Sequence, residues 1–203
     1  MNKRLYPILY TFLLTLVFVA ATSAVAALMR PGIALNDRLL TRRVVIRAAG
    51  LLPEAADDRA VDQLYDERIA PLTDRDTRGI EILTVDGGRG GYVFRTAGQG
   101  YWGRIEGYVG VSSDLTQLTG VVFYKHVETP GLGGEIARDW FGAQFAGKRL
   151  DPSADPMIDL VEPGADLGPA QVHAVTGATR TSDAVETFLN RDLRTFLEVM
   201  SPK

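Results

Sequence analysis

The sequence reads Thr176-Gly177-Ala178-Thr179-Arg180-Thr181-Ser182 where an apolar, strand-like stretch gives way to an amphipathic helix. Small residues just before a helix let backbone N–H groups approach a phosphate, whose charge the helix N-terminus favours. The stretch is therefore a candidate phosphate site that carries hydroxyl groups. We expect the helix from about residue 182 to 200, because apolar residues recur there at helical spacing: Val185, Phe188, Leu189, Leu193, Phe196 and Leu197.

A second interpretation of the same stretch needs no ligand. Thr176 or Thr179 caps the helix through its hydroxyl group, and Gly177 turns the chain. Taken alone, these residues favour this capping interpretation. The apolar stripe of the following helix indicates core packing and not a cofactor-binding surface.

A Gly-rich segment upstream changes that balance. It reads Glu128-Thr129-Pro130-Gly131-Leu132-Gly133-Gly134-Glu135-Ile136. Together with Thr176–Thr179 it resembles the FMN-binding domain family, in particular two covalently flavinylated proteins of membrane redox complexes. These are the C subunit of the sodium-translocating NADH:quinone oxidoreductase and the G subunit of the Rnf complex. The similarity covers roughly residues 101–185 and includes Tyr101-Trp102-Gly103, Gly120–Tyr124 and Gly147–Leu150.

The resemblance implies a covalent cofactor. In that family the last Thr of the four-residue motif is esterified to the phosphate of FMN by a dedicated flavin transferase, and in this sequence that residue is Thr179. Glycines of the upstream loop let the backbone lie against the flavin ring, since no Cβ blocks the approach. The residues expected around the cofactor are Thr176, Gly177, Ala178, Arg180, Glu128, Thr129, Leu132, Gly133 and Lys125.

One position departs from the family pattern. The family usually has Asp six residues before the modified Thr, within the stretch that the transferase recognises, and this sequence has His173. We interpret His173 as an exposed or hydrogen-bonded residue on a short strand. An imidazole that supplies positive charge near the phosphate is the alternative.

Composition excludes several kinds of redox centre. The chain of 203 residues contains no Cys, so iron–sulfur clusters, thiolate nucleophiles, disulfides and covalent c-type haem are excluded. His126 and His173 are the only imidazoles, too few for a His-rich metal site. The formal net charge of −3 argues against nucleic acid as a partner. Redox chemistry must therefore come from a bound organic cofactor or from a partner.

The N-terminus predicts a membrane anchor. The segment from Leu5 to Met29 carries no charge, and about 20 apolar residues suffice to cross the hydrocarbon core. A cleaved signal peptide is the alternative, because Ser23–Ala27 offers an A-x-A cleavage site. The apolar core of a signal peptide usually runs about 7–15 residues, and this segment is longer. We therefore expect a retained transmembrane helix.

The orientation of the anchor is predicted differently by charge and by resemblance. Several arginines follow the apolar segment, and the positive-inside rule by itself keeps the following domain in the cytoplasm. The family places its flavin domain on the periplasmic side. We adopt the family's orientation and expect a single-pass protein of the inner membrane.

The rest of the chain predicts an α+β fold with a mostly antiparallel sheet flanked by helices. We expect an anchor over residues 1–30, a helical connector over 31–75 and an FMN-binding domain over 76–203. The expected helices cover residues 36–50, 57–69 (with Asp57 as N-cap), 135–145 and 182–200. The expected strands cover 78–85 and 91–95, around a turn at 86–88, and then 105–111 and 118–124; residues 149–168 read as a loop.

The sequence shows no acid–base pair and no Ser-His-Asp arrangement, so independent catalysis is not expected. Glu128 and Glu135 are interpreted as structural or solvated rather than catalytic. The leading hypothesis is a membrane-anchored electron-transfer subunit of an ion-translocating oxidoreductase, with FMN on Thr179 and redox partners on other chains. An accessory subunit that has lost the flavin and a free-standing exported FMN-binding protein released near Ala26 are the alternatives.

Overall fold

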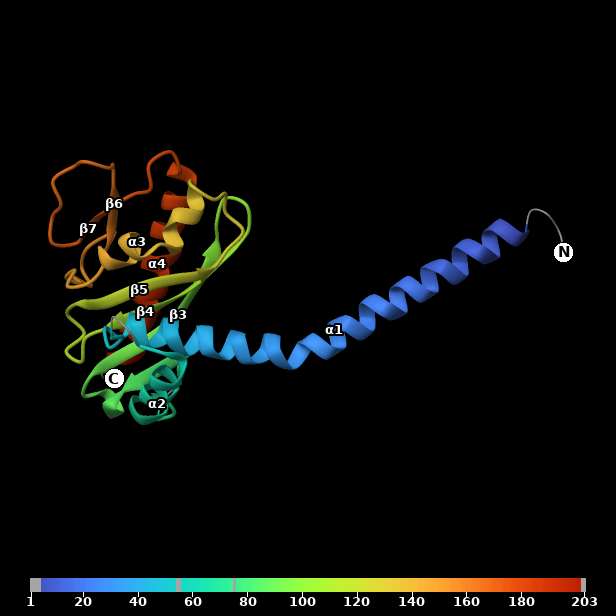
Figure 1. Ribbon diagram of the computed structural model, residues 1–203. Coiled ribbons are helices and arrows are strands. Elements are labelled where there is room, and N and C mark those ends of the chain that lie inside the picture. The colour runs from blue at the N-terminus through green and yellow to red at the C-terminus, as the bar shows by residue number, and fades with distance from the viewer. Residues whose placement is uncertain (1–4, 54–55, 75, 202–203) are drawn as a thin grey trace. The chain divides into compact units, whose positions relative to one another are not determined.

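The computed structural model describes residues 5–53, 56–74 and 76–201 (Figure 1). Contacts divide the chain into two units, Met1–Leu40 and Thr41–Lys203. Helix α1 (Leu5–Ala48) contributes to both units. Residues 41–75 of the expected connector (31–75) therefore belong to the second unit.

Helix α1 contains the expected apolar segment. Among the described residues it is the one helix long and apolar enough to cross a membrane, with a mean hydropathy of 2.3 in its most apolar window. The helix predicted over residues 36–50 is not a separate element. It is the continuation of α1, which passes through Pro31 and ends at Ala48.

The second unit is built on one antiparallel sheet, which confirms the predicted α+β fold. Its strand order is β1-β2-β3-β4-β5, so each strand pairs with its neighbour in the sequence. The strands are β1 (Ile69–Pro71), β2 (Ile82–Val85), β3 (Gly91–Gln99), β4 (Arg104–Val111) and β5 (Leu118–Lys125). The predicted turn at residues 86–88 joins β2 to β3 as a short 3-10 element, η1 (Asp86–Gly88).

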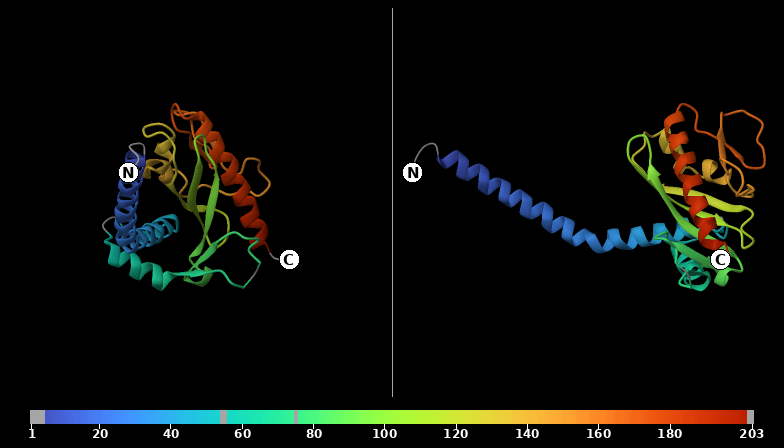
Figure 2. Two further views of the ribbon diagram at one scale, coloured as in Figure 1. Left: turned by 90° about the vertical axis from the view of Figure 1, so that its right-hand side faces the viewer. Right: turned by 180° about the vertical axis from the view of Figure 1, so that it is seen from behind.

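Each face of the sheet carries its own core. On one face, helix α4 (Thr179–Met200) places its predicted apolar stripe against Phe94, Val109 and Phe123. On the other face, the end of α1 and helix α2 (Asp58–Arg68) pack over a second apolar cluster. Figure 2 shows α2 and α4 on opposite sides of the sheet.

The end of α1 packs closely on the sheet. Val45, Ile46 and Ala48 are fully buried. The Ala48 carbonyl oxygen accepts a hydrogen bond of 2.7 Å from Thr119 Oγ1. A Cβ added at Gly110 would lie 2.0 Å from the same oxygen, so only glycine fits beneath the helix end.

Helix α2 begins as predicted and ends differently. Asp57 caps it, because the carboxylate accepts a hydrogen bond of 2.8 Å from the N–H of Ala60. The helix ends at Arg68, and Ile69, expected as its last residue, is the first residue of strand β1. Pairing with β2 satisfies the backbone of this short segment and overrides its helical pattern.

Three further predictions need correction. The helix expected over 135–145 is split into η2 (Gly133–Ala137) and α3 (Asp139–Ala143), because Arg138 between them is extended. The expected loop over 149–168 contains strand β6 (Asp159–Val161), which pairs in parallel with β7 (Gln171–His173). Helix α4 begins at Thr179, ahead of the predicted start at residue 182, so Thr179 is its first residue.

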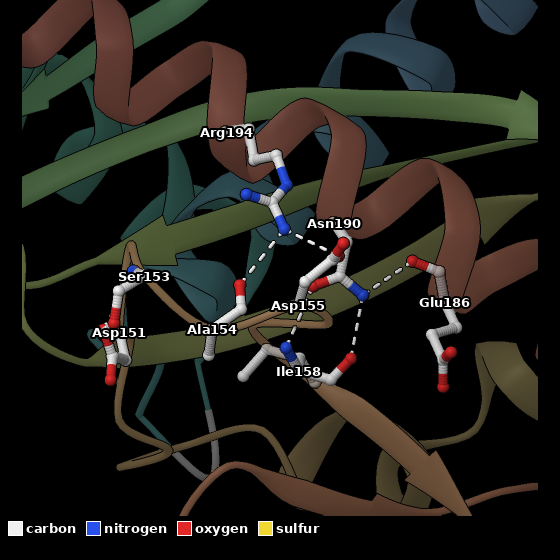
Figure 3. Close-up of polar contacts among 8 residues, drawn as sticks. All are labelled: Asp151, Ser153, Ala154, Asp155, Ile158, Glu186, Asn190 and Arg194. Atoms are coloured by element: carbon white, nitrogen blue, oxygen red, sulfur yellow. Dashed lines mark hydrogen bonds and ion pairs between the residues drawn. The ribbon is translucent and has the colours of Figure 1, made fainter.

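Helix α4 also holds the chain before β6, as Figure 3 shows. The buried Asn190 side chain accepts a hydrogen bond of 2.9 Å from the N–H of Ile158 and donates one of 2.8 Å to its carbonyl oxygen. Arg194 donates to the Ala154 carbonyl oxygen at 3.1 Å and to Asp155 at 2.6 Å. These bonds fix a stretch that has little regular structure of its own.

The burial of α1 in the second core can be tested with Ile46→Ala. We expect the free energy of unfolding to fall by about 2–5 kcal/mol, because the substitution removes buried methyl and methylene groups and leaves a cavity. Urea denaturation followed by circular dichroism measures the change. Leu35→Ala is the matched control, since Leu35 lies on the same helix and is 54% exposed. Equal stabilities of the two variants would contradict the placement of α1 in the core.

Candidate functional site

The N-terminus of α4 has no side-chain cap. Its N-cap residue is Ala178, and the first helical bond runs from the N–H of Ser182 to the Ala178 carbonyl oxygen at 3.0 Å. The capping interpretation of Thr176 and Thr179 is therefore wrong. Thr179 lies inside the first turn, where its hydroxyl cannot reach forward as a cap, and Thr176 lies outside the turn. Both residues are exposed, and the first turn contains no acidic residue.

Gly177 turns the chain, as predicted, and lies against the Gly-rich loop. Its φ of +73° is in the left-handed region, which disfavours any residue with a Cβ. A Cβ at this position would lie 3.3 Å from Leu132 Cδ2. Leu132 itself is 45% exposed. The two motifs predicted from sequence therefore adjoin at their exposed surfaces.

A buried hydrogen bond joins the two motifs below that surface. Thr181 Oγ1 donates to Glu128 Oε2 at 2.7 Å, and both residues are almost fully buried. Gly133 passes directly beside this bond, since a Cβ there would lie 2.5 Å from Thr181 Oγ1. Sequence reasoning placed Thr181 within the motif but did not predict this contact, which depends on the folded positions of both segments.

Two exposed aromatic residues contact the two motifs, Tyr101 at the first turn of α4 and Trp102 at the Gly-rich loop. The Arg180 guanidinium lies over the ring of Tyr101, 5.2 Å from its centroid. Trp102 Nε1 donates a hydrogen bond of 3.1 Å to Thr129 Oγ1. Tyr101 and Trp102 are 47% and 63% exposed. Because the sequence marked these aromatics only through the family resemblance, the contact of Tyr101 with Arg180 was missed.

Lys125 is placed with a different group of side chains. Its Nζ lies 3.9 Å from Glu106 Oε1, and Glu106 also pairs with Arg95. The hydrogen bond from Arg95 lowers the pKa of the Glu106 carboxyl, and the charge of Lys125 adds to the effect. Within the described ranges, no hydrogen bond or ion pair joins Lys125 to either motif.

His173 lies on strand β7, which agrees with its interpretation as a residue of a short strand. Its Nδ1 lies 3.4 Å from the carbonyl oxygen of Glu162. The backbone of His173 exchanges two hydrogen bonds with the Gln144 side chain, at 2.9 and 3.3 Å. The segment that leads to Thr176 is therefore held on both sides.

These groups suit a phosphate and an aromatic ring better than acid–base catalysis. The first turn of α4 presents backbone N–H groups that have no acceptor inside the helix, and Arg180 adds a cation beside them. In the described part of the chain, the Thr179 hydroxyl makes no hydrogen bond with the protein. Among the same residues, no cluster of three or more His, Asp or Glu side chains could hold a metal ion.

Comparison with known proteins points to one family. A model described as the FMN-binding domain matches residues 100–194, which include both motifs. The C subunit of the Na(+)-translocating NADH-quinone reductase of Pseudomonas aeruginosa is 30% identical over 192 residues, which cover 82% of this chain and 74% of that protein. The corresponding protein of Vibrio vulnificus is 40% identical over 91 residues, but the match covers only 36% of its length.

Solved structures share the fold. The crystal structure of the C subunit of the Na(+)-translocating NADH-quinone reductase from Parabacteroides distasonis superposes with a TM-score of 0.68 at 24% identity, over 86% of this chain and 98% of that one. NqrC of Shewanella oneidensis gives a TM-score of 0.69 at 22% identity, over 83% and 100% of the two chains.

The contact between the motifs can be tested with Gly177→Ala. We expect a loss of about 1–2 kcal/mol in the free energy of unfolding, because a Cβ is strained in the left-handed region and meets Leu132. Urea denaturation measures the loss. Adding Leu132→Ala should restore the part of the lost unfolding free energy that comes from the contact between the new Cβ and Leu132. A double variant no more stable than Gly177→Ala would argue against that contact.

Proposed function

Because this chain belongs to the NqrC family, the C subunits of the Na(+)-translocating NADH-quinone reductases, we propose that it carries FMN and transfers electrons within a membrane redox complex. The observation that carries this proposal is the exposed Thr179 in the first turn of α4, at a helix N-terminus that has no side-chain cap. The family resemblance makes Thr179 the attachment residue. The partners that give and take the electrons are other subunits of the complex.

The proposed bond is a phosphoester between Thr179 Oγ1 and the FMN phosphate. Direct condensation with a phosphate would release water and is unfavourable in water, so the donor is a flavin nucleotide activated as a phosphoanhydride. The Oγ1–P bond forms as the phosphoanhydride bond breaks, the nucleotide leaving group departs, and the hydroxyl proton is lost to a base. A flavin transferase is the proposed catalyst of this step.

The residues of the site fit an attached phosphate. Free N–H groups of the first turn, the helix dipole and Arg180 all favour its negative charge. Gly177 and Ala178 carry no bulky side chain that would cover this turn. Arg180 belongs to this turn, and its contact with the Tyr101 ring limits the freedom of the guanidinium.

The flavin ring needs an apolar surface close to the attachment turn. Leu132 adjoins Gly177, and Trp102 is held through its indole N–H by Thr129. These residues are the proposed neighbours of the ring. FMN supplies the electron-carrying chemistry when bound, and the protein supplies its orientation and surroundings. Lys125, which pairs with Glu106, is the predicted contact that this placement supports least.

The length and mean hydropathy of α1 support a retained single-pass anchor in the inner membrane. We place the flavin domain on the periplasmic side, following the family resemblance over the positive-inside count. We further propose an ion-translocating NADH:quinone oxidoreductase or Rnf-type complex as the host.

The attachment can be tested by the intact mass of full-length protein co-expressed with a flavin transferase. We expect the mass to increase by one FMN less one water, and we expect Thr179→Ala to abolish the increase. Thr187→Ala is the matched control, because Thr187 is an exposed threonine of the same helix outside both motifs and its loss should leave the increase unchanged. In-gel flavin fluorescence after denaturation provides a second measurement.

An unmodified wild-type chain would overturn the covalent flavoprotein assignment. It would favour an accessory subunit that keeps the fold without the flavin, for which His173 in place of the usual Asp is the supporting observation. Sequencing the N-terminus of the mature protein tests the anchor. A start near Ala27 would favour an exported, free-standing protein.

A further inference from the structure

We propose that Glu128 is a positioning residue that acts through Thr181 and Trp102 to fix the flavin site. Its carboxylate joins the Gly-rich loop to the first turn of α4 and to the turn that carries the exposed aromatics. This inference rests on the proposed function, in which Thr179 carries the flavin.

The two carboxylate oxygens of Glu128 have separate partners. Oε1 accepts a hydrogen bond of 2.9 Å from the N–H of Trp102, and Oε2 accepts one of 2.7 Å from Thr181 Oγ1. Glu128 is only 4% exposed. A buried carboxylate is costly unless it is hydrogen-bonded, so these two bonds compensate for its burial and at the same time fix their donors.

The surrounding backbone leaves room for this carboxylate and for little else. A Cβ at Gly100 would lie 2.6 Å from Glu128 Oε1, and a Cβ at Gly133 would lie 2.8 Å from Oε2. Both distances are too short for real contacts. Two glycines from different segments thus let the chain close around one side chain. A larger residue at either position would displace the carboxylate or its partners.

The carboxylate is linked to both parts of the proposed site. Thr181 lies in the same helical turn as Thr179, so fixing Thr181 fixes the attachment turn. Trp102 is fixed through its backbone by Glu128 and through its indole by Thr129. Because Glu128 is itself buried, it acts through these neighbours and not by touching the flavin ring.

The first test compares Thr181→Val with Thr181→Ser. Valine keeps the shape of threonine but removes the donor to Glu128, whereas serine retains the hydroxyl. In Thr181→Val we expect backbone amides of residues 177–182 to exchange hydrogen about tenfold faster, since a bond to a buried charged group is lost. Amides in β4 and β5 should keep their wild-type rates, and Thr181→Ser should resemble wild type. Hydrogen exchange followed by mass spectrometry measures this in unmodified full-length protein.

The second test uses the protein with FMN attached. We expect Thr181→Val and Glu128→Gln to gain the same mass as wild type, but to show lower fluorescence anisotropy of the flavin and a shifted midpoint potential. Glu135→Gln is the matched control, because Glu135 belongs to the same Gly-rich segment and contacts Arg138 and Trp140 instead of α4. It should match wild type in both measurements.

The outcomes separate this inference from the proposed function. A wild-type chain that gains no FMN refutes the proposed function and with it the flavin-positioning role, while exchange in the unmodified protein still tests whether Glu128 fixes the turn. Wild-type exchange rates in Thr181→Val would overturn the inference. A uniform increase over the whole domain, or unchanged anisotropy and potential, would also overturn it, because Glu128 would then support only general stability.

Discussion

The hydrogen bond from Thr181 to Glu128 holds together the two segments on which the site depends. It ties the Gly-rich loop to the first turn of α4, an end of the helix that has no side-chain cap. A charged acceptor strengthens the bond, and burial protects it from water. The rest of α4 then anchors the turn through the apolar core on one face of the sheet.

Much of the fold could be predicted because long elements repeat a pattern. Strands β4 and β5 alternate or cluster β-branched and aromatic residues, and α4 repeats apolar residues at helical spacing, so the two strands and the C-terminal end of α4 were found close to their true limits. Strands β1, β6 and β7 have three residues each and are defined by the partner they pair with. The apolar residues on both sides of Arg138 keep helical spacing in the sequence. Periodicity alone therefore predicted one continuous helix and could not reveal the break at Arg138.

The site was predictable at the level of motifs and not of contacts. Gly177 has the positive φ expected of a glycine that turns the chain. The two motifs lie next to each other, as expected if both contribute to one site. The pairings of Arg180 with Tyr101 and of Glu128 with Thr181 join residues far apart in the chain, and no local pattern encodes them. Lys125 was expected near the flavin, but it lies at the end of strand β5 with its Nζ close to Glu106.

The burial of Val45, Ile46 and Ala48 determines where the globular unit, residues 41–203, can be joined to a different membrane anchor. A gene fusion that exchanges the apolar helix for another anchor must join upstream of Thr41, because a later junction removes part of the folded interior. Insertions and deletions that change the length of the chain between the anchor and the globular unit should accordingly fall before Thr41. The helix thus belongs partly to the globular module, whatever element precedes it.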